Sequence, residues 1–286
     1  MTLHDPSPTP PVQPRSVHNL PPIWPLLKDQ PLHWLALGFK DLAHAPLLSM
    51  LHGLVLALFG GFITWVAHDR FWLLAGSLSG FMVIAPVLAT SLYAMSQAME
   101  RGEPVDFQLL IKTWTQWQMR LRHAPDSYWS LIRFGLLLAL AATGWVITSA
   151  ALITLLAPTP IHTPIDFLRH VVLAKQGYLF EIWVGLGAMM ALPMFASSVI
   201  SMPLLLDRQV TVLQAVLTSW KAVLTHPFQM ALWAFLIMGF SMLGIASLFM
   251  GLILIIPVLG HGSWHAYRQM VDVSNLNERL SDPGAH

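Results

Sequence analysis

The chain has 286 residues, of which 55% are hydrophobic and 10% are charged. About a quarter of the residues of an ordinary soluble domain carry a charge, and a soluble fold has too little interior to hide this much apolar surface. The composition therefore indicates a protein of the lipid bilayer. The net charge of +1 excludes the strongly basic surface typical of nucleic-acid binding, and the absence of Cys excludes disulfides, thiolate metal sites and Cys nucleophiles.

The first segment, residues 1–30, is rich in proline and lacks the basic and apolar regions of a secretory signal. Such a density of proline prevents helix and strand, so we expect a disordered cytoplasmic tail. A Pro-motif ligand for another protein is the alternative interpretation. A second, polar cytoplasmic tail is expected at 273–286.

Charge-free apolar runs predict six transmembrane helices, because a bilayer core of about 30 Å needs about 20 helical residues. Four are expected at 46–67, 71–97, 134–157 and 182–206. The stretch 222–267 contains no Asp, Glu, Lys or Arg, and at about 1.5 Å per residue it is too long for one membrane helix. We expect a hairpin there, with a turn near 244–251 and helices at 227–247 and 249–268.

The positive charges predict the orientation, because Lys and Arg in short loops stay on the cytoplasmic side. With six spans, twelve of the fifteen Lys and Arg fall on the side that carries both termini. The other side carries only Arg70, Arg169 and Lys175. We therefore expect cytoplasmic N- and C-termini.

An internal repeat divides the membrane domain, residues 31–272, into modules at 31–103, 104–209 and 210–272. A proline opens the first span of each module, at Pro46, Pro125 and Pro227. The second span of each module carries a similar phrase around a proline, VIAPVL, ISMPLL and LIIPVL, where we expect a kink.

Apolar stripes with a helical period at 107–122 and 211–224 predict helices that lie in the membrane interface. The predicted fold is thus an all-α polytopic membrane protein of three repeated modules, each led by a cytoplasmic interfacial helix. An insertion at 158–177 in the middle module predicts a short helix on the outer face.

Four phrases carry a family resemblance: GFKDLAHAPLLSMLHGLVLALFG, MERGEPV, SMPLLLDRQV and GHGSWHAYRQMV. Together they resemble an uncharacterised family of bacterial multi-pass inner-membrane proteins, catalogued as a domain of unknown function, over about residues 30–272. The resemblance implies a location in the bacterial inner membrane and no assigned reaction. Members are sometimes loosely labelled as similar to cytochrome c oxidase subunit I, but the chain has about half the helices of that subunit.

Motifs for catalysis are missing, since the chain has no G-x-S-x-G elbow, H-E-x-x-H pair or P-loop. Apart from Arg268 at the end of the sixth, no expected span contains an Asp, Glu, Lys or Arg, which an ion-coupled transporter would need at membrane depth. We therefore expect a non-enzymatic protein without catalytic residues or cofactor, whose partners are the lipid bilayer and other membrane proteins but not nucleic acid. The alternatives are a channel or transporter for a neutral or apolar solute, and a haem- or metal-binding membrane protein.

Three histidines, His52, His261 and His265, are the candidates for a ligand site, because they reach a similar depth in the cytoplasmic leaflet. His261 and His265 also share one helix face. The alternative is that each imidazole bonds a Ser, Tyr or carbonyl of a neighbouring helix. A mostly apolar cavity beside them would be lined by Pro86, Ser91, Tyr93, Pro257 and Ser263.

Overall fold

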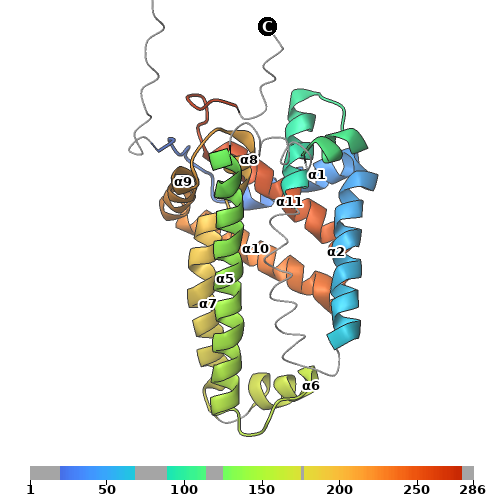
Figure 1. Ribbon diagram of the computed structural model, residues 1–286, viewed down its shortest axis with the longest axis vertical. Coiled ribbons are helices and arrows are strands. Elements are labelled where there is room, and N and C mark those ends of the chain that lie inside the picture. The colour runs from blue at the N-terminus through green and yellow to red at the C-terminus, as the bar shows by residue number, and fades with distance from the viewer. Residues whose placement is uncertain (1–19, 68–88, 114–124, 175–176, 279–286) are drawn as a thin grey trace, which may run out of the picture.

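The computed structural model describes residues 20–67, 89–113, 125–174 and 177–278, and within these it is built from helices (Figure 1). The only strand-like pairings there are two isolated bridges, Ile23 with Val271 and Arg208 with Glu278. The named helices are α1 (Gln30–His44), α2 (Pro46–Ala67), α5 (Pro125–Leu156), α6 (Pro164–Phe167), the π-helix η1 (Leu168–Val172), α7 (Leu179–Ser198), α8 (Ser201–Asp207), α9 (Val212–Thr225), α10 (Pro227–Ala246) and α11 (Leu252–Met270). Residues 89–101 and 107–113 are also helical.

Four segments of the described chain are long and apolar enough to cross a membrane: Pro46–Val66, Gly135–Leu156, Leu179–Asp207 and Pro227–Ala246. They correspond to four of the six expected spans. Most of the second expected span, 71–88, lies outside the described residues, and its end at 89–101 is helical. The sixth, 249–268, forms α11 but is not among the four, because its second half carries Gly, Ser, His and Arg.

The prolines predicted to open a span in each module do begin a helix, since α2, α5 and α10 start at Pro46, Pro125 and Pro227. Proline suits the first helical turn, where its missing N–H has no acceptor to lose. The third span was expected to start at 134, but α5 already begins nine residues earlier and only its part from Gly135 is apolar enough to cross a bilayer.

The segment Leu179–Asp207 is divided into two helices, with a break at Val199 and Ile200. Pro203 has no N–H to donate to the carbonyl four residues before it, which lies at Val199, so the helical ladder opens there. The Ile200 N–H instead donates to Ser219 Oγ of α9 at 3.2 Å. The distortion expected at this proline is therefore found one turn ahead of it.

The hairpin predicted for the charge-free stretch is present as α10 and α11, joined by residues 247–251. Leu248 and Phe249 in the turn have φ angles of 54° and 68°, a left-handed conformation that is uncommon for such side chains. Phe249 is buried against Ala57 and Leu252. Burial of its ring offsets the strain of the turn.

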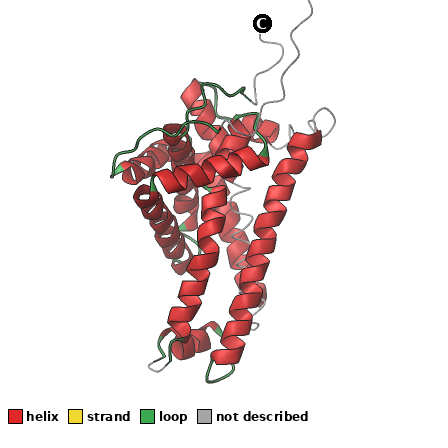
Figure 2. Ribbon diagram, turned by 90° about the vertical axis from the view of Figure 1, so that its left-hand side faces the viewer, coloured by secondary structure: helices red, strands yellow, loops and turns green. Residues whose placement is uncertain are grey.

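The stretch expected at 211–224 forms α9, which lies across the end of α7 (Figure 1); Figure 2 shows the same end of the molecule after a turn of 90°. A capping box at Thr211 and Gln214 starts it. The stretch expected at 107–122 is helical over 107–113, and the remainder lies outside the described residues. The insertion at 158–177 contains the short helices α6 and η1, at the opposite end of the molecule from α1, α8 and α9 (Figure 1).

Helix α11 is the element against which α1 and α2 pack, and two glycines allow the approach. A Cβ added at Gly38 of α1 would lie 2.3 Å from the Val258 carbonyl oxygen, and one added at Gly53 of α2 would lie 2.5 Å from that of Ile253. Pro257 leaves the Ile253 carbonyl without its helical partner, and this is the carbonyl that Gly53 meets. Small residues at such contacts let helix backbones pack directly.

Candidate functional site

His261 lies at the centre of the candidate site, fully buried in α11. Its Nε2 is 3.0 Å from Ser49 Oγ of α2, and its Nδ1 is 2.7 Å from Ser96 Oγ in the helix at 89–101. Both ring nitrogens thus face hydroxyl groups of other helices. A metal at His261 would have to displace one of these hydroxyls.

The direction of these bonds follows from the third partner of Ser96. Ser96 Oγ donates to Asp41 Oδ2 at 2.6 Å, so its lone pairs accept the proton of His261 Nδ1. In a neutral imidazole the other nitrogen is an acceptor, and His261 Nε2 accepts from the Ser49 hydroxyl. The pattern therefore assigns the Nδ1–H tautomer to His261. Each hydrogen bond in the series Ser49, His261, Ser96 is donated in the direction of Asp41.

Asp41 lies on α1 and is 8% exposed. Besides the hydrogen bond from the Ser96 hydroxyl, Asp41 accepts one from His265 Nε2 at 2.8 Å, and His261 Nδ1 lies 3.9 Å from its Oδ2. Burial acts to raise the pKa of Asp41, but the hydrogen bonds from His265 and Ser96 and the electrostatic interactions with the two histidines outweigh burial, so its pKa lies below the ordinary value. Asp41 is therefore held as a buried carboxylate.

His265 extends this series of polar contacts toward the surface. Its Nδ1 is 4.0 Å from Glu100 Oε1, and Glu100 Oε2 accepts from Arg268 Nε at 3.1 Å. Glu100 and Arg268 are about one-third exposed. Arg268 also reaches Asp207 Oδ2 at 3.9 Å, which joins the Asp41 side of the site to a second buried carboxylate.

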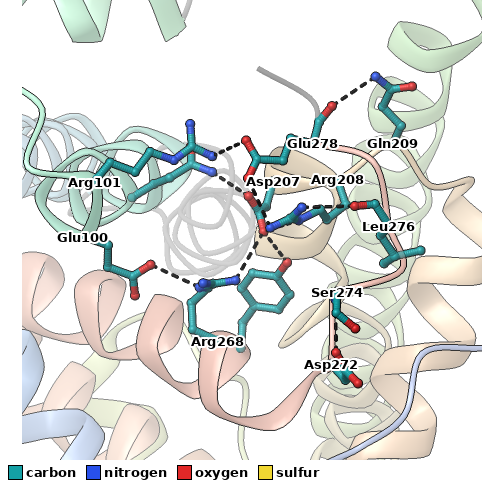
Figure 3. A network of polar contacts seen from close by, with 12 residues as sticks. Glu100, Arg101, Asp207, Arg208, Gln209, Arg268, Asp272, Ser274, Leu276 and Glu278 are labelled. Carbon is teal, nitrogen blue, oxygen red and sulfur yellow. Dashed lines mark hydrogen bonds and ion pairs between the residues drawn. The ribbon is translucent and has the colours of Figure 1, made fainter. Parts of the chain in front are cut away.

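Asp207, the last residue of α8, is 2% exposed and accepts bonds from three elements (Figure 3). Gln97 Nε2 and the Tyr267 hydroxyl each donate at 2.6 Å, and Arg208 Nε donates at 2.9 Å. Burial acts to lower the pKa of Arg208, but the adjacent charge of Asp207 and its hydrogen bond raise it above the ordinary value. Asp207 is thus supplied with donors, as a buried acidic group requires.

We call these side chains together the polar cluster, and its members are Asp41, Ser49, Ser96, Gln97, Glu100, Asp207, Arg208, His261, His265, Tyr267 and Arg268. Two segments near the chain ends, around residues 21–24 and 270–278, adjoin it. Arg208 also donates to the Leu276 carbonyl at 3.1 Å, and Glu278 pairs with Arg101 at 3.0 Å (Figure 3). The two segments bond each other where the Trp24 N–H donates to the Met270 carbonyl.

Of the candidate ligands, His261 and His265 come together through Asp41, whereas His52 directs its Nδ1 to the Leu48 carbonyl of its own helix at 2.8 Å. Among the described residues, no group of three His, Asp or Glu side chains is placed to hold a metal ion. Sequence reasoning missed both carboxylates because they lie outside the apolar runs. The spacing on α1 could have indicated that Asp41 is buried. It follows the buried Trp34 and Gly38 by seven and three residues, so all three share one face of the helix.

The residues expected to line a cavity are placed differently. Pro86 lies outside the described residues, Ser91 and Tyr93 are buried, Pro257 is buried inside α11, and the Ser263 hydroxyl donates to the Leu259 carbonyl at 2.8 Å. The structure instead has a cleft of about 510 Å³ between the start of α2 and the turn after residue 101. It is lined by His44, Ala45, Pro46, Leu47, Leu48, Met99, Gly102, Glu103 and Val105.

Comparison with known proteins adds one finding. Residues 73–207 match the model of a family described as "Predicted integral membrane protein (DUF2189)". The chain is similar to a membrane protein family of unknown function. The match covers a little under half of the chain and runs from the second expected span to Asp207 of the polar cluster. It confirms the resemblance to such a family, over fewer residues than the 30–272 expected, and it gives no support to the cytochrome c oxidase label.

No curated protein and no solved structure matches the chain. Together, the family match and the four apolar helices of the described chain make this an integral membrane protein.

Proposed function

We propose that the protein is a non-enzymatic protein of the bacterial inner membrane that works by association, holding lipid or other membrane proteins against its apolar flanks. In this proposal the chain crosses the membrane six times in three modules, and both termini are cytoplasmic. The polar cluster ties the three modules together at the cytoplasmic end.

The observation that carries the proposal is where the members of the cluster come from. Asp41, Ser49 and Ser96 belong to the first module, Asp207 to the second and His261 to the third. These side chains bond other members of the cluster, so the polar groups are used to hold helices together. Hydrogen bonds between membrane helices commonly serve this purpose.

A repeated backbone corner supports the division into modules. Ala45, between α1 and α2, has φ −131° and ψ 64°, and His226, between α9 and α10, has φ −127° and ψ 59°. In both corners the N–H bonds the carbonyl four residues earlier, at Asp41 and Ala222. Two chain segments far apart in sequence thus make the same turn before a proline.

The outer faces of the spans support association within the bilayer. In the apolar windows of α5 and α10, only 17% of the residues are buried inside the protein. Large apolar side chains follow the exposed face of α5: Leu136, Leu137, Leu140, Ile147 and Leu155. Such a surface fits lipid tails or the helix of another membrane protein.

The experiment that separates this proposal from a haem or metal protein is the absorption spectrum and metal content of the purified protein. We expect no Soret band and no stoichiometric metal. Replacing His261 and His265 with Ala should lower the free energy of unfolding by about 1 to 2 kcal/mol, the worth of interhelical hydrogen bonds, whereas His33→Ala on the exposed face of α1 should not. A Soret band or bound metal that disappears in His261→Ala would overturn the proposal.

A further inference from the structure

The cleft at the start of α2 lies apart from the polar cluster and shares none of its members. Leu47, Leu48, Met99 and Val105 give it a mostly apolar wall, and the only side chains with a formal charge or an imidazole in the lining are Glu103 and His44. The turn that closes one side needs glycine, because Gly102 has a φ of +66°. A mostly apolar cleft with a few polar groups is the usual form of a small-molecule site.

The position of the cleft at the start of a span places it at the membrane surface. Pro46 is the first residue of a span, so the lining residues on either side of it lie where headgroups meet acyl chains. From there an exposed apolar stripe descends along one face of α2 through Leu47, Leu51, Leu54 and Leu58. At 1.5 Å per residue this stripe is about 16 Å long, roughly the depth of one leaflet.

The charges of the cleft favour one class of headgroup. Arg101 pairs with Glu103 at 4.0 Å, but its shorter bond, at 3.0 Å, goes to Glu278. The Glu103 carboxylate is about half exposed, so it can accept an ammonium group. His44 is exposed on the same lining and can donate an N–H to a phosphate. A carboxylate beside an imidazole complements a zwitterion that carries both groups.

We propose that this cleft binds a phospholipid whose headgroup carries a primary ammonium, with its acyl chain along the exposed stripe of α2. The ammonium donates to Glu103 and the phosphate lies at His44. The inference rests on the proposed function, and it names the class of lipid with which the protein associates. A primary ammonium can donate hydrogen bonds to the carboxylate, and the trimethylated ammonium of a choline headgroup cannot.

Native mass spectrometry of the full-length protein in detergent tests the proposal. The probes are dioleoyl phosphatidylethanolamine, phosphatidylcholine and phosphatidylglycerol, which differ only in the headgroup. We expect the ethanolamine lipid to be retained about five-fold better than the choline lipid, a ratio that corresponds to about 1 kcal/mol. In Glu103→Gln this ratio should fall to about one. In Leu47→Trp, a change at an 85% exposed position, retention of both lipids should fall because the indole fills the mouth of the cleft.

Glu181→Gln is the control, because Glu181 is an exposed glutamate in the first turn of α7, at the other end of the molecule; it should leave the ratio unchanged. Equal retention of the ethanolamine and choline lipids, a preference for the anionic glycerol lipid, or an unchanged ratio in Glu103→Gln would each overturn the inference. These outcomes do not bear on the metal content and the absorption spectrum, so a failure of the cleft and a failure of the proposed function can be distinguished.

Discussion

Two buried carboxylates lie in the polar cluster, and donors from several helices surround them. An ionised carboxylate costs several kcal/mol to remove from water, and Asp41 and Asp207 offset this cost by accepting several hydrogen bonds each. Donors and acceptors come from different helices, so moving one helix leaves a charge buried without a partner. The carboxylates therefore specify how the helices are arranged at this end of the molecule.

Replacing Asp41 with Ala should destabilise the protein by about 3 kcal/mol, because Ser96 and His265 both lose a buried partner. Chemical unfolding in detergent micelles measures this change. Asp29→Ala is the matched control, since Asp29 is exposed at the start of the same helix and its side chain makes no capping bond. The double variant Asp41→Ala/His265→Ala should cost less than the sum of the two single variants. Full additivity would show that the two side chains do not interact.

The lowered pKa of Asp41 predicts a pH dependence of stability. A carboxyl whose folded pKa is depressed contributes stability above its unfolded pKa of about 3.9 and loses it as the pH falls through the folded value. Unfolding midpoints recorded between pH 6 and pH 3 should therefore fall less steeply in Asp41→Asn than in the wild type. Asp29→Asn should keep the wild-type slope. Identical slopes in all three proteins would mean that Asp41 is not held ionised by the fold.

The sequence places His261 and His265 on one face of a helix because their spacing of four residues is a local property. Their partner Asp41 is 220 and 224 residues away in the chain, and only the packing of α1 on α11 brings it there. His52 shows the limit of reasoning from depth alone. The sequence predicts a depth similar to that of the other two histidines, but the face of α2 that His52 occupies directs its ring to the Leu48 carbonyl.

Individual helices begin where prolines predict them to begin, but where they end and bend depends on their neighbours. Pro203 produces its break at Val199 and Ile200, where Ser219 of α9 accepts the Ile200 N–H. Pro257 lies inside the uninterrupted helix α11. The same residue type thus has two outcomes, and in the second Gly53 of α2 packs against the carbonyl that Pro257 frees. A pattern in one segment does not contain that information.

The face that α9 turns to the protein also differs from a simple amphipathic interpretation. Its buried positions are small, namely Ala215, Thr218, Ser219 and Ala222. The leucines of the predicted stripe point outward, as the exposure of Leu213, Leu217 and Leu224 shows. The stripe was predicted from its period, and the structure adds that its leucines face away from the protein, where a lipid interface would cover them.

The contact of α2 with α11 gives a prediction with an internal control. Gly53→Ala should lower the free energy of unfolding by at least about 2 kcal/mol, because the added Cβ would meet main-chain atoms of α11 that cannot move aside. Gly61→Ala in the same helix has no atom within 4 Å of the added Cβ and should be neutral or stabilising by up to about 1 kcal/mol. Thermal unfolding in detergent compares the two. Equal midpoints would contradict the packing of α2 on α11.

The whole molecule has two distinct ends. One end holds α1, α8, α9 and the polar cluster, and it also holds the paired segments near Ile23 and Val271 (Figure 1). The other end holds α6 and η1. With six spans, the charge distribution assigns the first end to the cytoplasm. The structure shows four apolar helices, and we propose two further crossings. Four and six spans put different loops on the same side of the membrane, so the side of each loop distinguishes the two numbers.

Labelling of single cysteines from each side of the membrane tests this arrangement most directly, because the chain has no native Cys. Cysteines placed at Glu103, Gln209 and Ser274 should react with a membrane-impermeant reagent only from the cytoplasmic side, and a cysteine at Asp166 only from the outer side. All four positions are exposed or partly exposed. Labelling of position 166 from the cytoplasm, or of positions 103 and 274 from opposite sides, would contradict the six-span arrangement and the placement of the polar cluster at the cytoplasmic end.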